Sequence, residues 1–230
     1  MSSTAETGPP KQPQSIDEAV EKVDYVSLRD ETANVLTHGI GVVLSLVAML
    51  YFWNLAADQH PGLRWSCVIF TISMATVYLF STLSHAVQTP LWRNRMRAWD
   101  QGTIYLLIVG TYTPFIWQGS PTGYRTLLLV LVWTAGLAGF YSKVLAKHRI
   151  NGISTVSYVL LGWLPAIPLF AHTPWICFGW MIGGGVCYSA GIFFLMRSHL
   201  FTYAHAIWHI MVMLGSACHC YAIYLLLQRI

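Results

Sequence analysis

Hydrophobic residues dominate seven stretches of this chain, and polar residues gather in the short connections between them. Each stretch is close to the roughly 20 residues that a helix needs to cross the hydrocarbon core of a membrane. Proline, glycine and asparagine, which favour turns, mark most of the connections. The pattern predicts transmembrane helices over residues 35–57, 65–87, 101–119, 124–143, 152–171, 174–196 and 203–227.

The first 30 residues have a different pattern, because they are polar and carry three early prolines. We expect residues 1–14 to be disordered, and residues 15–28, which open with the capping residue Ser15, to form an amphipathic helix on the membrane surface. The chain is therefore predicted to consist of a cytoplasmic tail, residues 1–30, and one seven-transmembrane domain, residues 31–230.

Two local features bear on how the predicted helices pack. Neighbouring helices must satisfy the backbone groups freed by prolines inside the spans, which are Pro114, Pro165 and Pro168. Small residues let helices approach closely in a membrane, and the sixth stretch carries a strip of them: Gly179, Gly183, Gly184 and Gly185.

Composition and charge agree with a multi-pass membrane protein. Hydrophobic residues make up 55% of the chain and charged residues only 10%. The net charge of +4 requires no nucleic-acid partner, because the basic residues sort by loop. With the N-terminus inside, ten Lys and Arg fall on the cytoplasmic side and three, Arg64, Arg125 and Arg229, on the other. This bias predicts a cytoplasmic N-terminus and an external C-terminus. We expect the protein to be integral to the plasma membrane.

Polar side chains at the edges of the apolar stretches are the candidates for chemistry. Asp100 is the one acidic residue after Gln59, Ser81 and His85 lie four residues apart, and so do His205 and His209. An ionisable group in a membrane is costly and usually marks a functional site with a partner. The predicted topology places all of them near the cytoplasmic leaflet, although they are far apart in sequence.

The three histidines at one depth predict a metal site formed by His85, His205 and His209. Residues four apart share a helical face about 6 Å apart along the axis, which suits two imidazoles on one ion. Three neutral imidazoles favour Zn²⁺, while copper, iron, nickel or a bis-histidine haem remain alternatives. A lone intramembrane histidine is more often a hydrogen-bonded packing residue.

Two further histidines are expected to be structural. His219 lies ten residues after His209, about 15 Å further along the helix, so we expect a structural hydrogen bond there. Glu31, Asn34 and His38 form a stripe at the inner end of the first span, at the right depth to approach the site. We expect them to cap that helix and tie it to the loops, and metal ligation by His38 is the alternative.

Several motifs resemble those of the hemolysin III family, the bacterial branch of the progestin and adipoQ receptor family. They are Glu31-x-x-Asn34-x-x-x-His38-Gly39, Ser81-Thr-Leu-Ser-His85, the run from Asp100 to Pro114, and His205-Ala-Ile-Trp-His209, followed by Gly215 and His219. They occur in the family's order and spacing over residues 31–230.

The resemblance implies a seven-helix fold with zinc near the cytoplasmic face, held by His85, His205 and His209. Asp100 would reach the metal through a water molecule, with Ser81 nearby. Because adiponectin-receptor members are associated with ceramidase activity, the resemblance also implies an intramembrane hydrolase that acts on a lipid amide such as a ceramide.

A three-histidine zinc with an open position acidifies a bound water, and Asp100 and Ser81 are the candidate catalytic residues beside it. The alternatives are a non-catalytic sensor or regulator of membrane homeostasis with a structural zinc, and a cytolytic protein of the hemolysin type. No predicted span carries the continuous polar stripe typical of a pore. The sequence does not determine the substrate or the oligomeric state.

Overall fold

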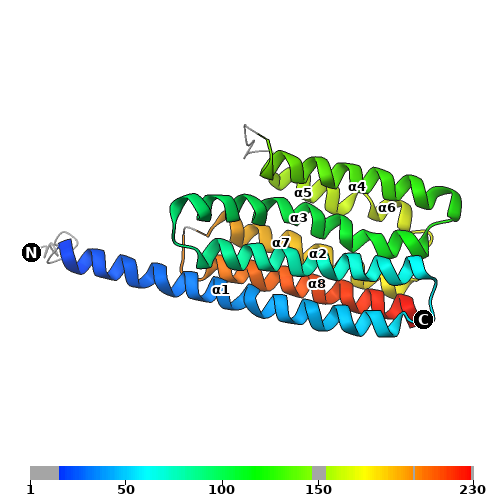
Figure 1. Cartoon of the computed structure of the whole chain (residues 1–230), viewed down its shortest axis with the longest axis horizontal. Coiled ribbons are helices and arrows are strands. Elements are labelled where there is room, and N and C mark those ends of the chain that lie inside the picture. Colours follow the sequence, from blue (N-terminus) through cyan, green and yellow to red (C-terminus); the bar gives the residue numbers. More distant parts are fainter. Residues whose placement is uncertain (1–15, 147–153, 199, 229–230) are drawn as a thin grey trace, which may run out of the picture.

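The computed structural model describes residues 16–146, 154–198 and 200–228, and in this part of the chain all regular secondary structure is helical. The helices run roughly parallel to one another in a single bundle (Figure 1). Their bounds are α1 Ile16–Leu55, α2 Pro61–Ala86, α3 Pro90–Gly119, α4 Thr122–Val144, α5 Ser154–Trp163, α6 Ala166–Leu169, α7 Trp175–Met196 and α8 Ala204–Gln228.

The bundle has seven crossing segments, because α5 and α6 are two parts of one segment that breaks at Pro165. Proline has no N–H to donate to the preceding turn, so the helix stops there. The predicted span over 152–171 is thus one segment interrupted at Pro165, one of the prolines that the sequence places inside it. Pro114, by contrast, lies inside α3 without breaking it.

Five helices are long and apolar enough to cross a membrane: Leu28–Leu55 of α1, α2, α4, α7 and α8. The α5–α6 segment is apolar but shorter. Helix α3 is less hydrophobic and lies between α2 and α4 (Figure 1), so neighbouring helices rather than lipid cover much of it. The predicted all-α, seven-helix membrane bundle is confirmed.

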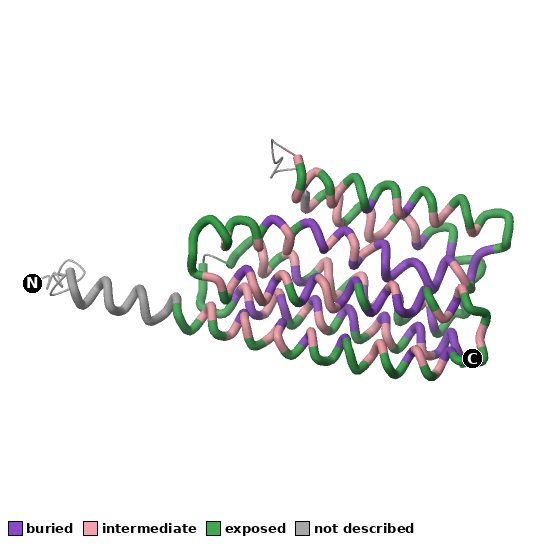
Figure 2. Tube along the Cα trace, viewed as in Figure 1, coloured by how far each residue is buried: buried purple, intermediate pink, exposed green. Residues whose placement is uncertain are grey.

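Burial divides the bundle into a core and a lipid-facing surface (Figure 2). The inner faces of α2, α3 and α8 supply most of the core, including Phe70, Phe115 and Ile223, each fully buried. The surface is apolar too, as Leu36 and Val43 of α1 and Leu127 of α4 show, each more than half exposed. Exposed leucine and valine over whole helix faces fit a hydrocarbon environment.

Proline sets the starts of four helices. Pro61 and Pro90 are the first residues of α2 and α3, while Pro121 and Pro174 immediately precede α4 and α7. The fixed φ of proline suits the first helical turn, where no N–H partner is required. Because of Pro90, α3 begins eleven residues before the predicted span 101–119.

The first helix is also longer than predicted. Residues 16–28 are helical, as expected, but they continue into α1 without a break rather than form a separate helix. The expectation of disorder for residues 1–14 lies outside the described residues.

The glycines of α7 act differently from one another. A Cβ on Gly184 would lie 2.4 Å from Nε2 of His219, so this glycine lets α8 pack closely against α7. Gly179 and Gly183 have nothing within 4 Å of such a Cβ, so the predicted packing strip is wrong for them.

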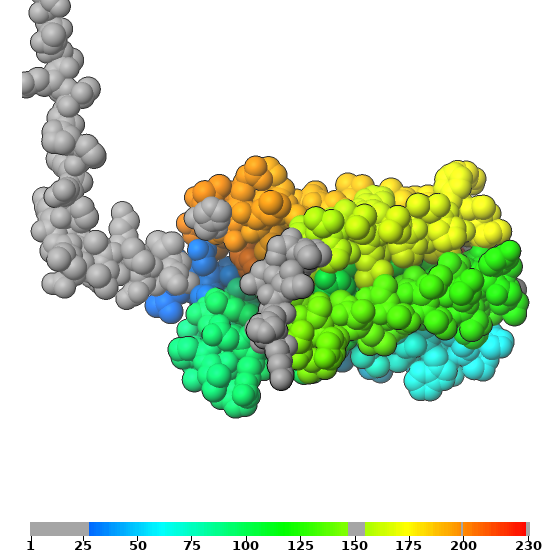
Figure 3. Space-filling model, turned by 90° about the horizontal axis from the view of Figure 1, so that it is seen from above, coloured from blue at the N-terminus to red at the C-terminus, as the bar shows by residue number. Residues whose placement is uncertain are grey.

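From above, α7, the α5–α6 segment and α4 lie side by side and form this face of the bundle (Figure 3).

Candidate metal centre

Three imidazoles meet between the C-terminal end of α2 and the N-terminal part of α8. One ring nitrogen each from His85, His205 and His209 lies within 4.8 Å of the other two. The ring centroids of His205 and His209 are 4.6 Å apart, and that of His85 is 4.9 Å from His205 and 5.3 Å from His209. The structure thus brings together the three residues that the sequence predicts as metal ligands.

The local structure of α8 explains how two of these rings share a face. His205 and His209 are one helical turn apart, in the first two turns of α8. The residue before α8, Tyr203, has a positive φ of 65°, which is uncommon for a residue with a side chain. The carboxylate of Asp30 on α1 accepts a hydrogen bond from the Tyr203 backbone N–H at 2.8 Å and so fixes this turn.

Asp100 and Ser81, the candidate catalytic residues, lie beside the histidines. The Ser81 hydroxyl is buried, 3.4 Å from Nε2 of His209, and within hydrogen-bonding reach of the Asp100 carboxylate. Ser84 donates to Oδ2 of Asp100 at 3.4 Å. The same Ser84 hydroxyl also donates to the backbone oxygen of Ser81 at 2.9 Å, so its contact with Asp100 is the weaker of the two.

The first helix contributes more to this site than the sequence predicts. His38 lies well inside α1, so it caps nothing; its ring stacks on that of His209, with centroids 3.7 Å apart and planes at 14°. Glu31 accepts a hydrogen bond from Nδ1 of His85 at 2.6 Å and pairs with Arg93 at the start of α3. The expected capping role is wrong, while the expected tie to a neighbouring segment is found for Glu31.

Thr37 is a site residue that the sequence analysis missed. Its Oγ1 lies 3.0 Å from Nδ1 of His209. A threonine inside an apolar helix carries no signal of its own. The available clue was position: Thr37 lies three residues after Asn34 in a stretch where one polar residue follows another.

The donor set fits a metal ion. Nε2 of His85 is buried and, among the described residues, has no hydrogen-bond partner. A buried polar atom without a partner is costly, and a metal ion satisfies a neutral imidazole nitrogen. Three imidazoles with a carboxylate nearby are typical ligands of zinc and other transition metals, and atypical of calcium or magnesium.

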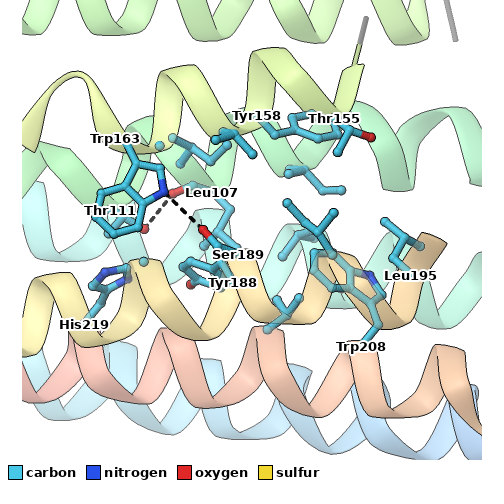
Figure 4. Close-up of a pocket in the computed structure, with 18 of the residues that line it drawn as sticks. Leu107, Thr111, Thr155, Tyr158, Trp163, Tyr188, Ser189, Leu195, Trp208 and His219 are labelled. Atoms are coloured by element: carbon cyan, nitrogen blue, oxygen red, sulfur yellow. Dashed lines mark hydrogen bonds between the residues drawn. The ribbon is translucent and has the colours of Figure 1, made fainter. Parts of the chain in front are cut away.

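An apolar cavity of about 350 Å³ begins at this cluster and extends between α3, α5, α7 and α8. His38, Ser81, Asp100 and His205 line one end. The lining is otherwise largely hydrophobic: Trp208 and Leu195 lie at the end opposite His219, and Leu107 lies between the two ends (Figure 4). The shape and lining suit a ligand with a polar group at the histidines and an apolar chain beyond.

The far end of the cavity is lined by His219, Tyr188, Ser189 and Trp163, whose Nε1 donates to Ser189 at 3.1 Å (Figure 4). His219 does not reach the three-histidine cluster. Its Nε2 donates to the backbone carbonyl of Met181 at 3.0 Å, which confirms the predicted structural hydrogen bond.

Fold and site together define a multi-pass helical membrane protein with a partly buried histidine cluster that could hold a metal. Comparison with known families identifies it further. The family model "Haemolysin-III related" matches residues 26–220, and the chain belongs to this family.

Similar proteins include Hemolysin-3 of Bacillus cereus, 37% identical over 198 residues that cover 83% of this chain and 88% of the relative. Hemolysin-3 homolog of Bacillus subtilis (strain 168) is 38% identical over 83% of this chain and 91% of its own length. Monocyte to macrophage differentiation factor of Homo sapiens is 22% identical over 87% of this chain and 85% of its own length. No solved structure gives a significant match. The family resemblance predicted from the motifs is confirmed, including the distant relationship to the adiponectin-receptor type.

Proposed function

We propose that this protein is a zinc-dependent hydrolase of the cytoplasmic membrane that cleaves a lipid amide of the ceramide type. The observation that carries the proposal is that candidate catalytic and metal-binding side chains line a cavity that is otherwise largely apolar. His205, which belongs to the three-histidine cluster, lines one end of a largely apolar cavity together with Asp100 and Ser81, so a lipid whose chain fills the cavity would present its polar group to them.

His85, His205 and His209 would hold the ion, because three protein ligands leave a zinc one open position. When bound, zinc supplies a Lewis acid and lowers the pKa of water toward neutrality. The protein's share of the chemistry is to position the reacting groups and exclude bulk water, which strengthens every electrostatic contact in the site.

Asp100 is the proposed general base. Its carboxylate lies beside the hydroxyls of Ser84 and Ser81 on α2, and it lines the cavity together with His205. It takes a proton from the attacking water as the oxygen bonds to the carbonyl carbon, and returns it to the nitrogen as the C–N bond breaks. The products are a carboxylic acid and an amine. Ser81 supports the water or the substrate oxygen.

The competing proposal is a non-catalytic sensor in which the metal clamps α2 to α8, since the three histidines come from these two helices. A structural zinc site is usually closed by a fourth protein ligand. The carboxylate on α3 that lines the same cavity therefore favours the hydrolase. The names of the two bacterial relatives favour cytolysis as a further candidate, which lysis of red cells by the purified protein would test.

Turnover of lipids by the full-length protein in nanodiscs separates hydrolase from sensor. We expect zinc-loaded native protein to release fatty acid from ceramide-like substrates, and Asp100→Asn to lower the rate by roughly 100-fold or more while keeping its zinc. Asparagine has the size of aspartate but cannot accept the proton. If the native protein releases no more fatty acid than Asp100→Asn from any of a broad panel of lipid amides and esters, the sensor proposal is correct.

A further inference from the structure

The first helix, α1, supplies none of the three histidines of the candidate metal site. Two of its side chains nevertheless contact a ring nitrogen of these histidines. Glu31 and Thr37, both on α1, contact Nδ1 of His85 and Nδ1 of His209. A neutral imidazole carries its proton on one nitrogen and offers a lone pair on the other, and the hydrogen bond at the first nitrogen decides which is which. These contacts therefore bear on how each ring meets a metal.

For His85 the proton must lie on Nδ1. The Glu31 carboxylate, 2.6 Å away, only accepts hydrogen bonds, so the ring nitrogen has to donate. The side-chain nitrogen of Asn34 lies 3.4 Å from the same Nδ1 and is the weaker neighbour at that distance. The lone pair of neutral His85 is then on Nε2, the atom that is buried without a partner in the described part of the chain.

For His209 the same result follows from counting hydrogens. The Thr37 hydroxyl has one hydrogen, and a backbone carbonyl already takes it: Oγ1 donates to the oxygen of Ala33 at 2.8 Å. Its oxygen can then only accept from Nδ1–H of His209, 3.0 Å away. Nε2 of His209 is left with its lone pair, facing the Ser81 hydroxyl at 3.4 Å.

Other contacts of α1 limit how these rings and helices move. The ring of His38 lies flat against that of His209, and Asp30 holds the turn that starts α8. Arg93 pairs with Glu31, which balances the charge of the carboxylate and links it to α3.

We propose that Glu31 and Thr37 are positioning residues that set the tautomers of His85 and His209, so that both rings present Nε2 to the metal. The inference rests on the proposed metal site and extends it to a helix that carries no ligand. Partners of this kind keep a ligating imidazole oriented, and their loss typically lowers metal affinity about 10- to 100-fold.

The test uses full-length protein in nanodiscs with ¹⁵N-labelled histidine, because the ¹⁵N shift reports which nitrogen carries the proton with or without metal. Thr37→Val removes the hydroxyl at nearly constant shape, and Thr37→Ser restores it. Thr32→Val is the matched control, since Thr32 is also on α1 and donates to a backbone carbonyl four residues back, but its side chain is exposed. Glu31→Ala and Glu31→Gln form the second pair, because glutamine keeps an accepting oxygen.

We expect Nδ1–H on His85 and His209 in the native protein. Thr37→Val and Glu31→Ala should disturb the tautomer of His209 and His85 respectively and weaken zinc binding about 10-fold or more in chelator competition. Thr37→Ser should recover most of this affinity, Glu31→Gln part of it, and Thr32→Val should match the native protein.

Protons on Nε2 of both rings in native protein would overturn the inference, and so would unchanged tautomers and affinity in Thr37→Val and Glu31→Ala. The proposed metal site fails separately: native protein that binds no zinc contradicts that proposal, while the tautomers of chelator-treated protein still decide the role of α1.

Discussion

Helix α8 carries two buried histidines, His209 and His219, whose surroundings differ. His209 is 1% exposed and His219 is 5% exposed. Around His209 lie three other imidazoles and the hydroxyls of Thr37 and Ser81. Around His219 lie one backbone carbonyl and the rings of Phe115 and Tyr188.

The difference shows that burial of a histidine in a membrane helix does not by itself indicate a metal. One carbonyl acceptor is enough to satisfy one N–H, and Met181 provides it for His219. At the other end, ring nitrogens of three histidines, His85, His205 and His209, lie within 4.8 Å of one another. An unpartnered nitrogen does not separate the two ends, because Nε2 of His85 and Nδ1 of His219 are both buried without a hydrogen-bond partner among the described residues. The grouping of several imidazoles is what indicates a metal site. We therefore distinguish a histidine-cluster end of α8, around His209, from a packing end, around His219.

The prediction with the largest expected effect concerns the side of the membrane on which the His209 end and the His219 end of α8 lie. The ten-to-three distribution of basic residues predicts that the His209 end is cytoplasmic and the C-terminus, beyond the His219 end, is external. Figure 1 shows the start of α1 and the end of α8 at opposite ends of the structure. A reporter active only outside the cytoplasm, fused at the C-terminus, should therefore be active. Activity of a cytoplasmic reporter at the same place would contradict this orientation.

Side chains at the two ends should also differ in their effect on turnover. We expect Ser81→Ala to lower release of fatty acid, by less than the roughly 100-fold expected for a general base, because Ser81 only supports the reacting groups. His219→Gln, which keeps a donor for the Met181 carbonyl, should leave kcat near the native value. The rates are measured at saturating substrate on zinc-loaded protein in nanodiscs. A larger loss of kcat in His219→Gln than in Ser81→Ala would reverse the assignment of the two ends.

The smallest effect concerns packing at the His219 end. Gly184→Ala places a methyl group 2.4 Å from Nε2 of His219, so the ring must shift. We expect the free energy of unfolding to fall by about 1–3 kcal/mol, as overpacking usually costs, with zinc content unchanged. Gly179→Ala is the control, because its added Cβ meets nothing within 4 Å. Denaturant unfolding in detergent measures both, and equal stability of the two variants would show that α7 and α8 do not pack closely at Gly184.

The sequence predicts the grouping of histidines at the histidine-cluster end because these residues carry strong local signals. His205 and His209 are spaced for one helical face, and His85 and Asp100 are rare polar residues at the edges of apolar stretches. The helix pattern then places them at one depth, and the structure brings the three histidines together. The metal itself and its chemistry stay predictions.

What the sequence does not predict depends on contacts between distant segments. Glu31 and Thr37 meet histidines 54 and 172 residues away, and no periodicity encodes such pairs. The start of α3 was misplaced because the arginine-rich stretch after Pro90 is too polar to count as a span, although it is helical. The sequence places Gly184 and Gly179 in the same strip of small residues. They differ only in their contacts with another helix, because a Cβ on Gly184 would meet His219 of α8 and one on Gly179 would meet nothing within 4 Å.

The most direct test of the account is the metal content of purified protein, measured by mass spectrometry for three forms side by side. Native protein should carry about one zinc per chain, as a three-histidine site predicts, and occupancy should fall as the pH is lowered toward about 5, because protonated imidazoles cannot ligate. The His205→Ala, His209→Ala double variant should carry almost none, while His219→Gln should match the native protein. Full retention of zinc by the double variant would contradict the metal centre proposed here, as would loss of zinc from His219→Gln alone.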